Sequence, residues 1–399
     1  MSAQQEPGEA LKGQVEFPER TLGEYRARWL GTVDQAYADM RRRIDAARHC
    51  VRLETYLMRE EGPATMLREA LLRARQRDVE VRVLLDAFGC EGVSDEFLQP
   101  LRDAGARVVR FNPRRFLRRA IRNHRKLLTV DGEHAFVGGF NIAPEYAGDG
   151  VTRGWCDSGV YVAGPVVKLL EDNFDAMLQL APFTPRAYQL FRREMRHSWR
   201  ASVTPDAPVQ IISSGPGMPR GALGYLLRRD LADAHNVSIA SAYFVPSKLL
   251  RNLINRVARR SGRVRVLLAG KSDVPLARLA AERFYKLLLG QRVRVYEYQP
   301  QILHAKVVVM DSIVWSGSGN LDRRSLSINY ELLLRFDWPE LADDARTWFA
   351  QALRHSELVN LARWRRGRTI WRKIASAFAW LILARIDPLL ARRGFRGLS

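Results

Sequence analysis

The stretch HRKLLTVDGEHAFVGGFN, residues 124–141, begins with a histidine and a lysine two positions apart and continues as an apolar run. A second stretch, HAKVVVMDSIVWSGSGN at residues 304–320, has the same layout. Side chains at i and i+2 of a strand share a face, so the imidazole and the ammonium of each stretch point the same way. The recurrence of this unusual strand start indicates an internal repeat.

Other segments repeat in the same order. RLETYLMR at 52–59 is followed in the second half by IASAYFVP at 239–246, and VEVRVLLDAFG at 79–89 by GRVRVLLAGKS at 262–272. Short β-branched runs alternate with segments of helical periodicity, which is typical of βα units with a largely buried sheet. The sequence therefore predicts an α/β protein in which one unit occurs twice.

We expect two α/β/α sandwich domains, at residues 15–197 and 198–365, related by a pseudo-two-fold axis. A chain of 399 residues exceeds what one hydrophobic core usually organises, and 47% hydrophobic residues are enough to build two. The polar, proline-containing stretch around residue 198 is the expected connection. Residues 366–399 form a basic tail.

Charge and cysteine content narrow the partners and the compartment. The formal net charge of +21 predicts an anionic partner, which could be nucleic acid, an acidic membrane surface or a phosphorylated substrate. Cys50, Cys90 and Cys156 are odd in number and include no C-x-x-C pair, so we expect a reducing cytoplasm, without disulfides or a zinc site. The polar N-terminus and the absence of a run of about 20 apolar residues favour a soluble or peripheral protein.

Each half supplies one imidazole, one ammonium and one amide donor, a set that suits a phosphate. These candidates are His124, Lys126 and Asn141 in the first half, and His304, Lys306 and Asn320 in the second. A phosphodiester attacked in two steps needs a nucleophile, an acid for the leaving alkoxide and fixed positive charge. Two half-sites that face each other at the domain interface would supply all three without a metal ion. The ordinary histidine pKa of about 6.5 makes both protonation states accessible.

Four acidic residues accompany the half-sites. Asp157 and Glu331 lie at similar distances downstream of the histidines, and each could orient an imidazole through its far ring nitrogen, although surface ion pairs are the alternative. Asp131 and Asp311 complete the repeated pattern but have the opposite strand parity from the histidines. Because an Asp-Gly pair between two apolar runs is a strong hairpin signal, we expect these two aspartates to shape turns rather than to touch substrate.

The doubled pattern H-x-K-x-x-x-x-D, followed by GGFN and SGSGN, resembles the phospholipase D superfamily. SAYFVP, GNLDRRSLSINYE and WCDSGVYVAGPVV are similar to bacterial cardiolipin synthases, in the short form without N-terminal spanning helices. The resemblance implies phosphatidyl transfer through a phosphohistidine, with no metal or other cofactor.

The resemblance also implies roles for individual residues. His124 and His304 become the nucleophile and acid pair, Lys126 and Lys306 bind the phosphate, and Asn141 and Asn320 are further donors. The family favours the N-terminal histidine as nucleophile, but the symmetry of the repeat leaves this open. Ser318 supplies a hydroxyl in the second half, whereas Gly139 occupies the matching position in the first, so a donor is expected to be missing there.

Two basic segments flank this pattern. NPRRFLRRAIRNHRK, residues 112–126, is either a solvated charge run or a lip that meets anionic head groups. From residue 363 onward the chain has ten Lys or Arg residues and a single acid, Asp387. Its longest uncharged segment, 374–384, is too short to span a membrane, so we expect an interfacial helix; a helix packed onto the domains is the alternative.

The predicted function is that of a cardiolipin synthase acting on phospholipids at the cytoplasmic face of the cell membrane, as a peripheral protein. Phosphatidylglycerol or phosphatidylethanolamine could be the donor, and the balance between transfer and hydrolysis stays open. A metal-independent nuclease or phospholipid hydrolase of the same superfamily is the alternative, since a basic protein with a phosphodiester site could also accept nucleic acid. The amphipathic tail favours the membrane and not nucleic acid, and the sequence identifies no protein partner.

Overall fold

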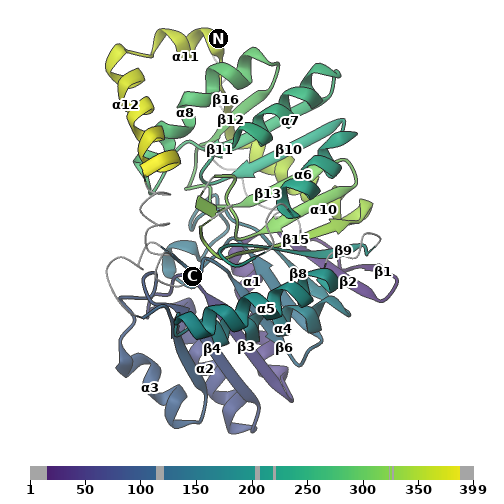
Figure 1. Cartoon of the computed structure of the whole chain (residues 1–399), viewed down its shortest axis with the longest axis vertical. Helices are drawn as coiled ribbons and strands as arrows, with labels where there is room; N and C mark the ends of the chain where they lie inside the picture. The colour runs from purple at the N-terminus through teal and green to yellow at the C-terminus, as the bar shows by residue number, and fades with distance from the viewer. Residues whose placement is uncertain are drawn as a thin grey trace, which may run out of the picture.

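The computed structural model describes residues 16–113, 121–202, 207–218, 222–322, 324–325 and 328–386. The middle of the basic stretch that precedes His124 lies outside these residues, as does the end of the tail. The described chain forms two stacked halves, each built on an eight-stranded sheet with helices against it (Figure 1). The α/β fold with a repeated unit is therefore confirmed.

The first half contains a mixed sheet with the order β1-β2-β8-β7-β6-β3-β4-β5. Its strands are β1 (Arg20–Leu22), β2 (Tyr25–Leu30), β3 (Cys50–Thr55), β4 (Glu80–Asp86), β5 (Arg107–Phe111), β6 (Leu127–Val130), β7 (His134–Gly138) and β8 (Gly159–Ala163). Its helices are α1 (Val33–Ala46), α2 (Pro63–Gln76), α3 (Asp95–Asp103), the short 3₁₀ helix η2 (Pro144–Tyr146) and α4 (Val166–Leu180). The long helix α5 (Pro185–Ser202) follows.

The second half contains a sheet with the order β16-β12-β11-β10-β13-β14-β15-β9. Its strands are β9 (Val209–Ser214), β10 (Asn236–Ser241), β11 (Arg263–Ala269), β12 (Arg294–Tyr298), β13 (Lys306–Met310), β14 (Ile313–Gly317), β15 (Glu331–Asp337) and β16 (Ser356–Leu358). Its helices are α6 (Ala222–Ala232), α7 (Lys248–Arg259), α8 (Pro275–Gly290) and α10 (Pro339–Arg354). The tail adds α11 (Leu361–Arg366), α12 (Ile370–Leu381) and the π-helical turn η3 (Ile382–Ile386).

Seven strands of each sheet share one topology, and β1 and β16 are added at opposite edges. Strands β3, β4 and β5 are parallel and are joined through α2 and α3, and β10, β11 and β12 are parallel and are joined through α7 and α8. An antiparallel group, β6-β7-β8 or β13-β14-β15, continues each sheet on the other side. The repeated sequence segments thus correspond to equivalent strands. Strands β6 and β13, which follow the two histidines, lie at the centre of their sheets.

The two halves share one hydrophobic cluster, and each half also has a cluster of its own. Helix α4 of the first half contacts β9 of the second, while α10 of the second half contacts β2 of the first. Trp348 of α10 packs at 6.0 Å from Trp29 and donates a hydrogen bond of 3.0 Å to the carbonyl of Gly31. The expected boundary between residues 197 and 198 falls inside α5. The division into domains 15–197 and 198–365 therefore stays a proposal about folding units.

The C-terminal helix α12 lies against α8, at the upper left of Figure 1. Arg372 joins the two helices, with Nη2 at 2.7 Å from Oε1 of Glu282 and Nε at 3.0 Å from Oε2. Ser376 and Ala379 are the buried residues of α12 itself. A helix packed onto the domains was the expected alternative to an interfacial helix, and α12 is packed in this way. Within the part of the chain described, we find no helix with both the length and the apolar character needed to cross a membrane.

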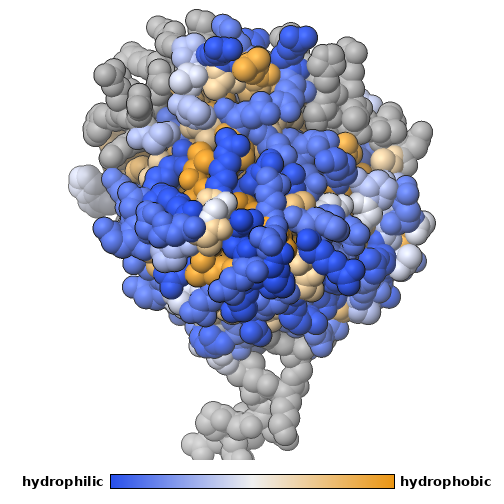
Figure 2. Space-filling model, turned by 90° about the horizontal axis from the view of Figure 1, so that it is seen from below, coloured by the Kyte–Doolittle hydropathy of each residue, from blue (hydrophilic) through white to orange (hydrophobic). Residues whose placement is uncertain are grey.

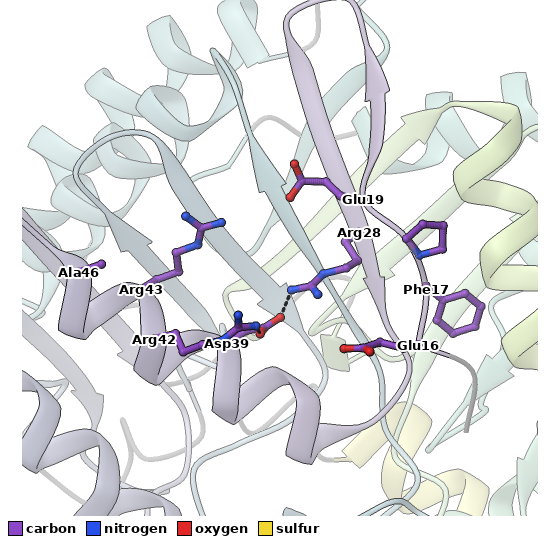
Figure 3. A pocket seen from close by; sticks show the side chains of 9 residues that line it. Glu16, Phe17, Glu19, Arg28, Asp39, Arg42, Arg43 and Ala46 are labelled. Carbon is purple, nitrogen blue, oxygen red and sulfur yellow. Dashed lines mark hydrogen bonds and ion pairs between the residues drawn. The ribbon is translucent and has the colours of Figure 1, made fainter. Parts of the chain in front are cut away.

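The face seen from below, on the side of the first half, is largely hydrophilic, and its hydrophobic patches are small and interrupted (Figure 2). A separate pocket lies between α1, β2 and the chain before β1 (Figure 3). Its charged lining residues are Glu16, Glu19, Arg28, Asp39, Arg42 and Arg43. Arg28 and Arg42 both pair with the buried Asp39. The acidic and basic groups balance, so this pocket is a poor candidate for a phosphate.

Candidate active site

The two histidines are brought together by backbone bridges that cross between the halves. The amide of His124 donates to the carbonyl of Tyr330 in the second half at 2.9 Å. The amide of His304 donates to the carbonyl of Cys156 in the first half at 2.8 Å. Each histidine segment is therefore anchored on the opposite half immediately before its strand enters the sheet. Both imidazoles are buried, with 8% and 3% of the residue exposed.

The carboxylates are exchanged between the halves in the same way. Nδ1 of His124 lies 3.0 Å from Oε2 of Glu331, and Nδ1 of His304 lies 2.6 Å from Oδ2 of Asp157. Both carboxyl groups are buried, which contradicts the alternative of surface ion pairs. Because each carboxyl group engages Nδ1, it orients the ring so that Nε2 is the nitrogen left for chemistry.

The two lysines sit beside the histidines that they follow. Nζ of Lys126 donates to the carbonyl of His124 at 2.6 Å. Nζ of Lys306 donates to the carbonyl of His304 and lies 3.0 Å from Nε2 of that ring. Both lysines are buried, with 4% of each residue exposed. Two ammonium groups are thus held next to the two imidazoles.

Burial and mutual repulsion shift the titration of these groups. Burial lowers the pKa of Lys126 to about 7 and that of Lys306 to about 8. Burial, followed by the charge of Lys306, lowers the pKa of His304 to about 4, although Asp157 opposes the shift. Burial and the two lysines hold the pKa of His124 well below its usual value. Burial therefore disfavours the protonated, positively charged forms of these histidines and lysines. A bound anion would raise their pKa values again, so the site suits a phosphate.

The two half-sites differ in their carboxyl groups. Burial raises the pKa of Glu331 to about 8, and Ser318 donates a hydrogen bond of 2.5 Å to its Oε2. In the first half, a Cβ added to Gly139 would lie 2.3 Å from Oδ1 of Asp157. The glycine is therefore required by the position of the carboxylate. Ser318 thus holds the carboxyl group that orients His124, and the first half has a glycine at the matching position.

The two asparagines are buried in different surroundings. Nδ2 of Asn141 donates to the hydroxyl of Tyr146 at 2.7 Å, and that hydroxyl lies 3.4 Å from Nε2 of His304. Asn141 therefore reaches the histidine through a tyrosine. Asn320 has 3% of its residue exposed, and its Oδ1 has no hydrogen-bond partner among the residues described.

Asp131 and Asp311 lie just beyond the ends of β6 and β13 that are far from the histidines. Both have positive φ angles, 56° and 46°. Asp131 accepts three backbone N–H groups, those of Arg48, His49 and Cys50, at 2.8–2.9 Å. Asp311 accepts the backbone N–H groups of His235 and Asn236, where β10 begins. The expectation that they shape turns agrees with this placement.

Aromatic rings that motif reasoning missed surround the imidazoles. The ring of Tyr56 lies 4.7 Å from that of His124. The rings of Tyr146 and Trp155 lie 5.1 and 5.4 Å from that of His304. Tyr56 belongs to the repeated segment RLETYLMR, so the repeat itself carried the signal for it. Tyr146 and Trp155 follow the motif within the first half but contact the histidine of the second, which no sequence spacing indicates.

Paired histidines and lysines between two repeated α/β halves define an enzyme of phosphodiester chemistry, and the comparisons identify its family. The family profile described as "Cardiolipin synthase, PLD-like domain" matches residues 40–178 and 227–353. This chain belongs to that family of phospholipase D-like phosphatidyltransferases, as its motifs indicated.

Relatives and solved structures agree with this assignment. Cardiolipin synthase 1 of Bacillus cereus is 29% identical over 366 residues, 90% of this chain and 71% of that protein. Cardiolipin synthase B of Shigella flexneri is 33% identical over 308 residues, 75% of this chain and 73% of that protein. The crystal structure of phosphatidylserine synthase from Haemophilus influenzae has the same fold, with a TM-score of 0.69 at 15% identity over 95% of this chain and 97% of that one.

Proposed function

We propose that this enzyme synthesises cardiolipin by moving a phosphatidyl group from one phospholipid to a hydroxyl of phosphatidylglycerol. The observation that carries the mechanism is the crossed pairing of each histidine Nδ1 with a carboxyl group of the other half. This pairing leaves two Nε2 atoms, flanked by two ammonium groups, to act on one phosphorus atom. The proposal is that the site catalyses two displacements at that atom.

In the first displacement, Nε2 of one histidine attacks phosphorus, a P–N bond forms and the P–O bond to the head-group alcohol breaks. The second histidine gives its proton to the leaving alkoxide. In the second displacement that histidine takes a proton from a hydroxyl of phosphatidylglycerol, whose oxygen attacks phosphorus as the P–N bond breaks. Lys126 and Lys306 supply fixed positive charge to the non-bridging oxygens. Either histidine could be the nucleophile.

The test is incubation of the pure protein with vesicles of labelled phosphatidylglycerol in EDTA, with His124→Ala and His304→Ala beside it. We expect cardiolipin and glycerol from the wild type and neither from the variants. Phosphatidic acid as the main product would point to a hydrolase. Intact lipid together with cleaved plasmid DNA would favour the nuclease alternative and overturn the proposal.

We also propose that the enzyme binds the cytoplasmic face of an anionic membrane through α12. The inner side of this helix packs on α8, whereas its outer side exposes large apolar residues. Their exposed fractions are 72% for Ile370, 80% for Trp371, 54% for Ile374, 59% for Phe378 and 41% for Leu381. The basic helix α11 precedes this surface. An apolar stripe beside basic residues is the pattern of an interfacial helix.

Co-sedimentation with phosphatidylglycerol vesicles tests this attachment without removing α12, whose loss would expose α8. The variant Trp371→Ser/Phe378→Ser gives up apolar contacts of about 3 kcal/mol in total if each ring is partly inserted, so we expect about a hundredfold weaker binding. Leu190→Ser/Tyr225→Ser is the matched control, because these side chains are exposed on α5 and α6. Equal binding of both variants would contradict the proposed attachment.

A further inference from the structure

Two equivalent tyrosines border the site, and they have partners of opposite charge. Tyr56 follows β3 and Tyr243 follows β10, at matching positions of the repeat. The hydroxyl of Tyr56 accepts a hydrogen bond of 3.0 Å from Nη1 of Arg122. The hydroxyl of Tyr243 donates a hydrogen bond of 2.6 Å to Oδ2 of Asp273. The repeat therefore places a guanidinium on one side of the site and a carboxylate on the other.

Arg122 lies at the edge of the site and has a hydrogen-bond donor that no described residue accepts. Its guanidinium carbon lies 4.2 Å from the centre of the Phe88 ring. Its Nε is buried and makes no hydrogen bond within the described chain. The Tyr56 ring that it contacts is the ring packed at 4.7 Å from His124, so one aromatic side chain separates the guanidinium from the imidazole. Arg122 is close enough to be among the charges that lower the pKa of His124, after burial and the lysines.

The position of the second half that matches Arg122 carries no guanidinium. Arg122 precedes His124 by two positions, and the residue two before His304 is Ile302. On that side Asp273 stands at the tyrosine instead, and its charge helps to raise the pKa of Lys306 against the effect of burial. An anion next to the reacting phosphate is therefore favoured beside His124 and repelled beside Tyr243.

Cardiolipin synthesis brings two phosphodiesters together, because the acceptor phosphatidylglycerol carries a phosphate of its own. The paired histidines and lysines serve the reacting phosphorus. We propose that Arg122 binds the phosphate of the acceptor lipid, and that this places the acceptor on the Tyr56 side of the site. The proposal rests on the proposed function. A planar guanidinium fixed by a hydroxyl and an aromatic face is well suited to a phosphate, because it is already ordered and can bind two oxygens.

The test separates acceptors that carry a phosphate from acceptors that do not. Arg122→Gln is compared with wild type in two reactions in EDTA: cardiolipin formation from phosphatidylglycerol, and exchange of labelled glycerol into phosphatidylglycerol. Both reactions break the same donor bond, but glycerol has no phosphate for Arg122 to bind. Arg68→Gln is the matched control, because its guanidinium carbon lies 4.3 Å from the centre of the Phe97 ring, outside the site.

We expect Arg122→Gln to lower kcat/KM for cardiolipin about 10- to 100-fold, as for the loss of a charged hydrogen-bonded contact, and to change glycerol exchange less than threefold. Arg68→Gln should change neither reaction. If both reactions slow equally, Arg122 acts on the donor phosphate or on the position of Tyr56. If the rate of cardiolipin formation is unchanged, Arg122 does not contribute to the site. Either result overturns this inference. A wild-type enzyme that exchanges glycerol but makes no cardiolipin would refute the proposed function instead.

Discussion

The two histidine–carboxyl pairs differ in a way that amide substitutions should expose. Burial raises the pKa of Glu331 to about 8, so we expect its carboxyl group to be mainly protonated at pH 7 and Glu331→Gln to keep its shape and neutral state. Asp157 instead raises the pKa of His304 through a hydrogen bond of 2.6 Å and through its charge. Asp157→Asn removes that charge and with it the support for the protonated imidazole. We therefore expect unequal losses from two chemically matched changes.

The size of the difference follows from the contact that is lost. A buried hydrogen bond to a charged group contributes about 1.5–3 kcal/mol, which corresponds to about 10- to 150-fold in rate. We expect Asp157→Asn to lower kcat by about this factor, and Glu331→Gln to lower it by less than about fivefold at pH 7, since no charge is lost.

The assay is cardiolipin formation under saturating phosphatidylglycerol in detergent micelles, which removes any effect of membrane binding. Melting temperatures of both variants serve as the control for folding. Equal losses, or a larger loss for Glu331→Gln, would refute the reasoning that the protonation state of Glu331 makes its pair with His124 different from the pair of Asp157 with His304.

Two further predictions follow from the same groups. The value of kcat/KM should fall as the pH rises through about 7 to 8, where Lys126 and Lys306 lose their protons in the free enzyme; a level profile up to pH 10 would contradict this. Gly139→Ala should push the Asp157 carboxylate away from His304 and lower activity as much as Asp157→Asn does. The double variant should then lose little more activity than either single variant, whereas additive losses would show that the glycine acts independently.

The sequence predicted the repeated fold because the repeat contains the strands that build each sheet. RLETYLMR contains the end of β3 and IASAYFVP the end of β10, and each of these strands is parallel to the next repeated strand. The recurrence of their pattern pointed to the histidine, lysine and asparagine of each half, but the argument from strand periodicity does not apply to the two histidines, because they lie just before β6 and β13. Local spacing also separated Asp131 from the site through its hairpin turn.

Contacts between the halves could not be predicted from local spacing. Nothing in the spacing shows that Asp157 orients the histidine of the other half, because the exchange depends on how two finished sheets pack together. The requirement for Gly139 is of the same kind, since it depends on the space that the Asp157 carboxylate occupies. The tail was harder to predict because α12 has two apolar sides, and only the packed fold shows that Ala379 faces α8 while Trp371 faces out.

The crossed contacts also explain how a nearly symmetric site can perform two different steps. Both imidazoles receive a carboxyl group from the opposite half, so neither half holds a complete histidine pair by itself. Because the two carboxyl groups differ, with Ser318 on Glu331 and no hydroxyl at Gly139, the repeat does not make the imidazoles equivalent. In the first step the nucleophilic histidine must be neutral while the other histidine is protonated. The different carboxyl partners of the two imidazoles are the simplest structural source of this difference in protonation.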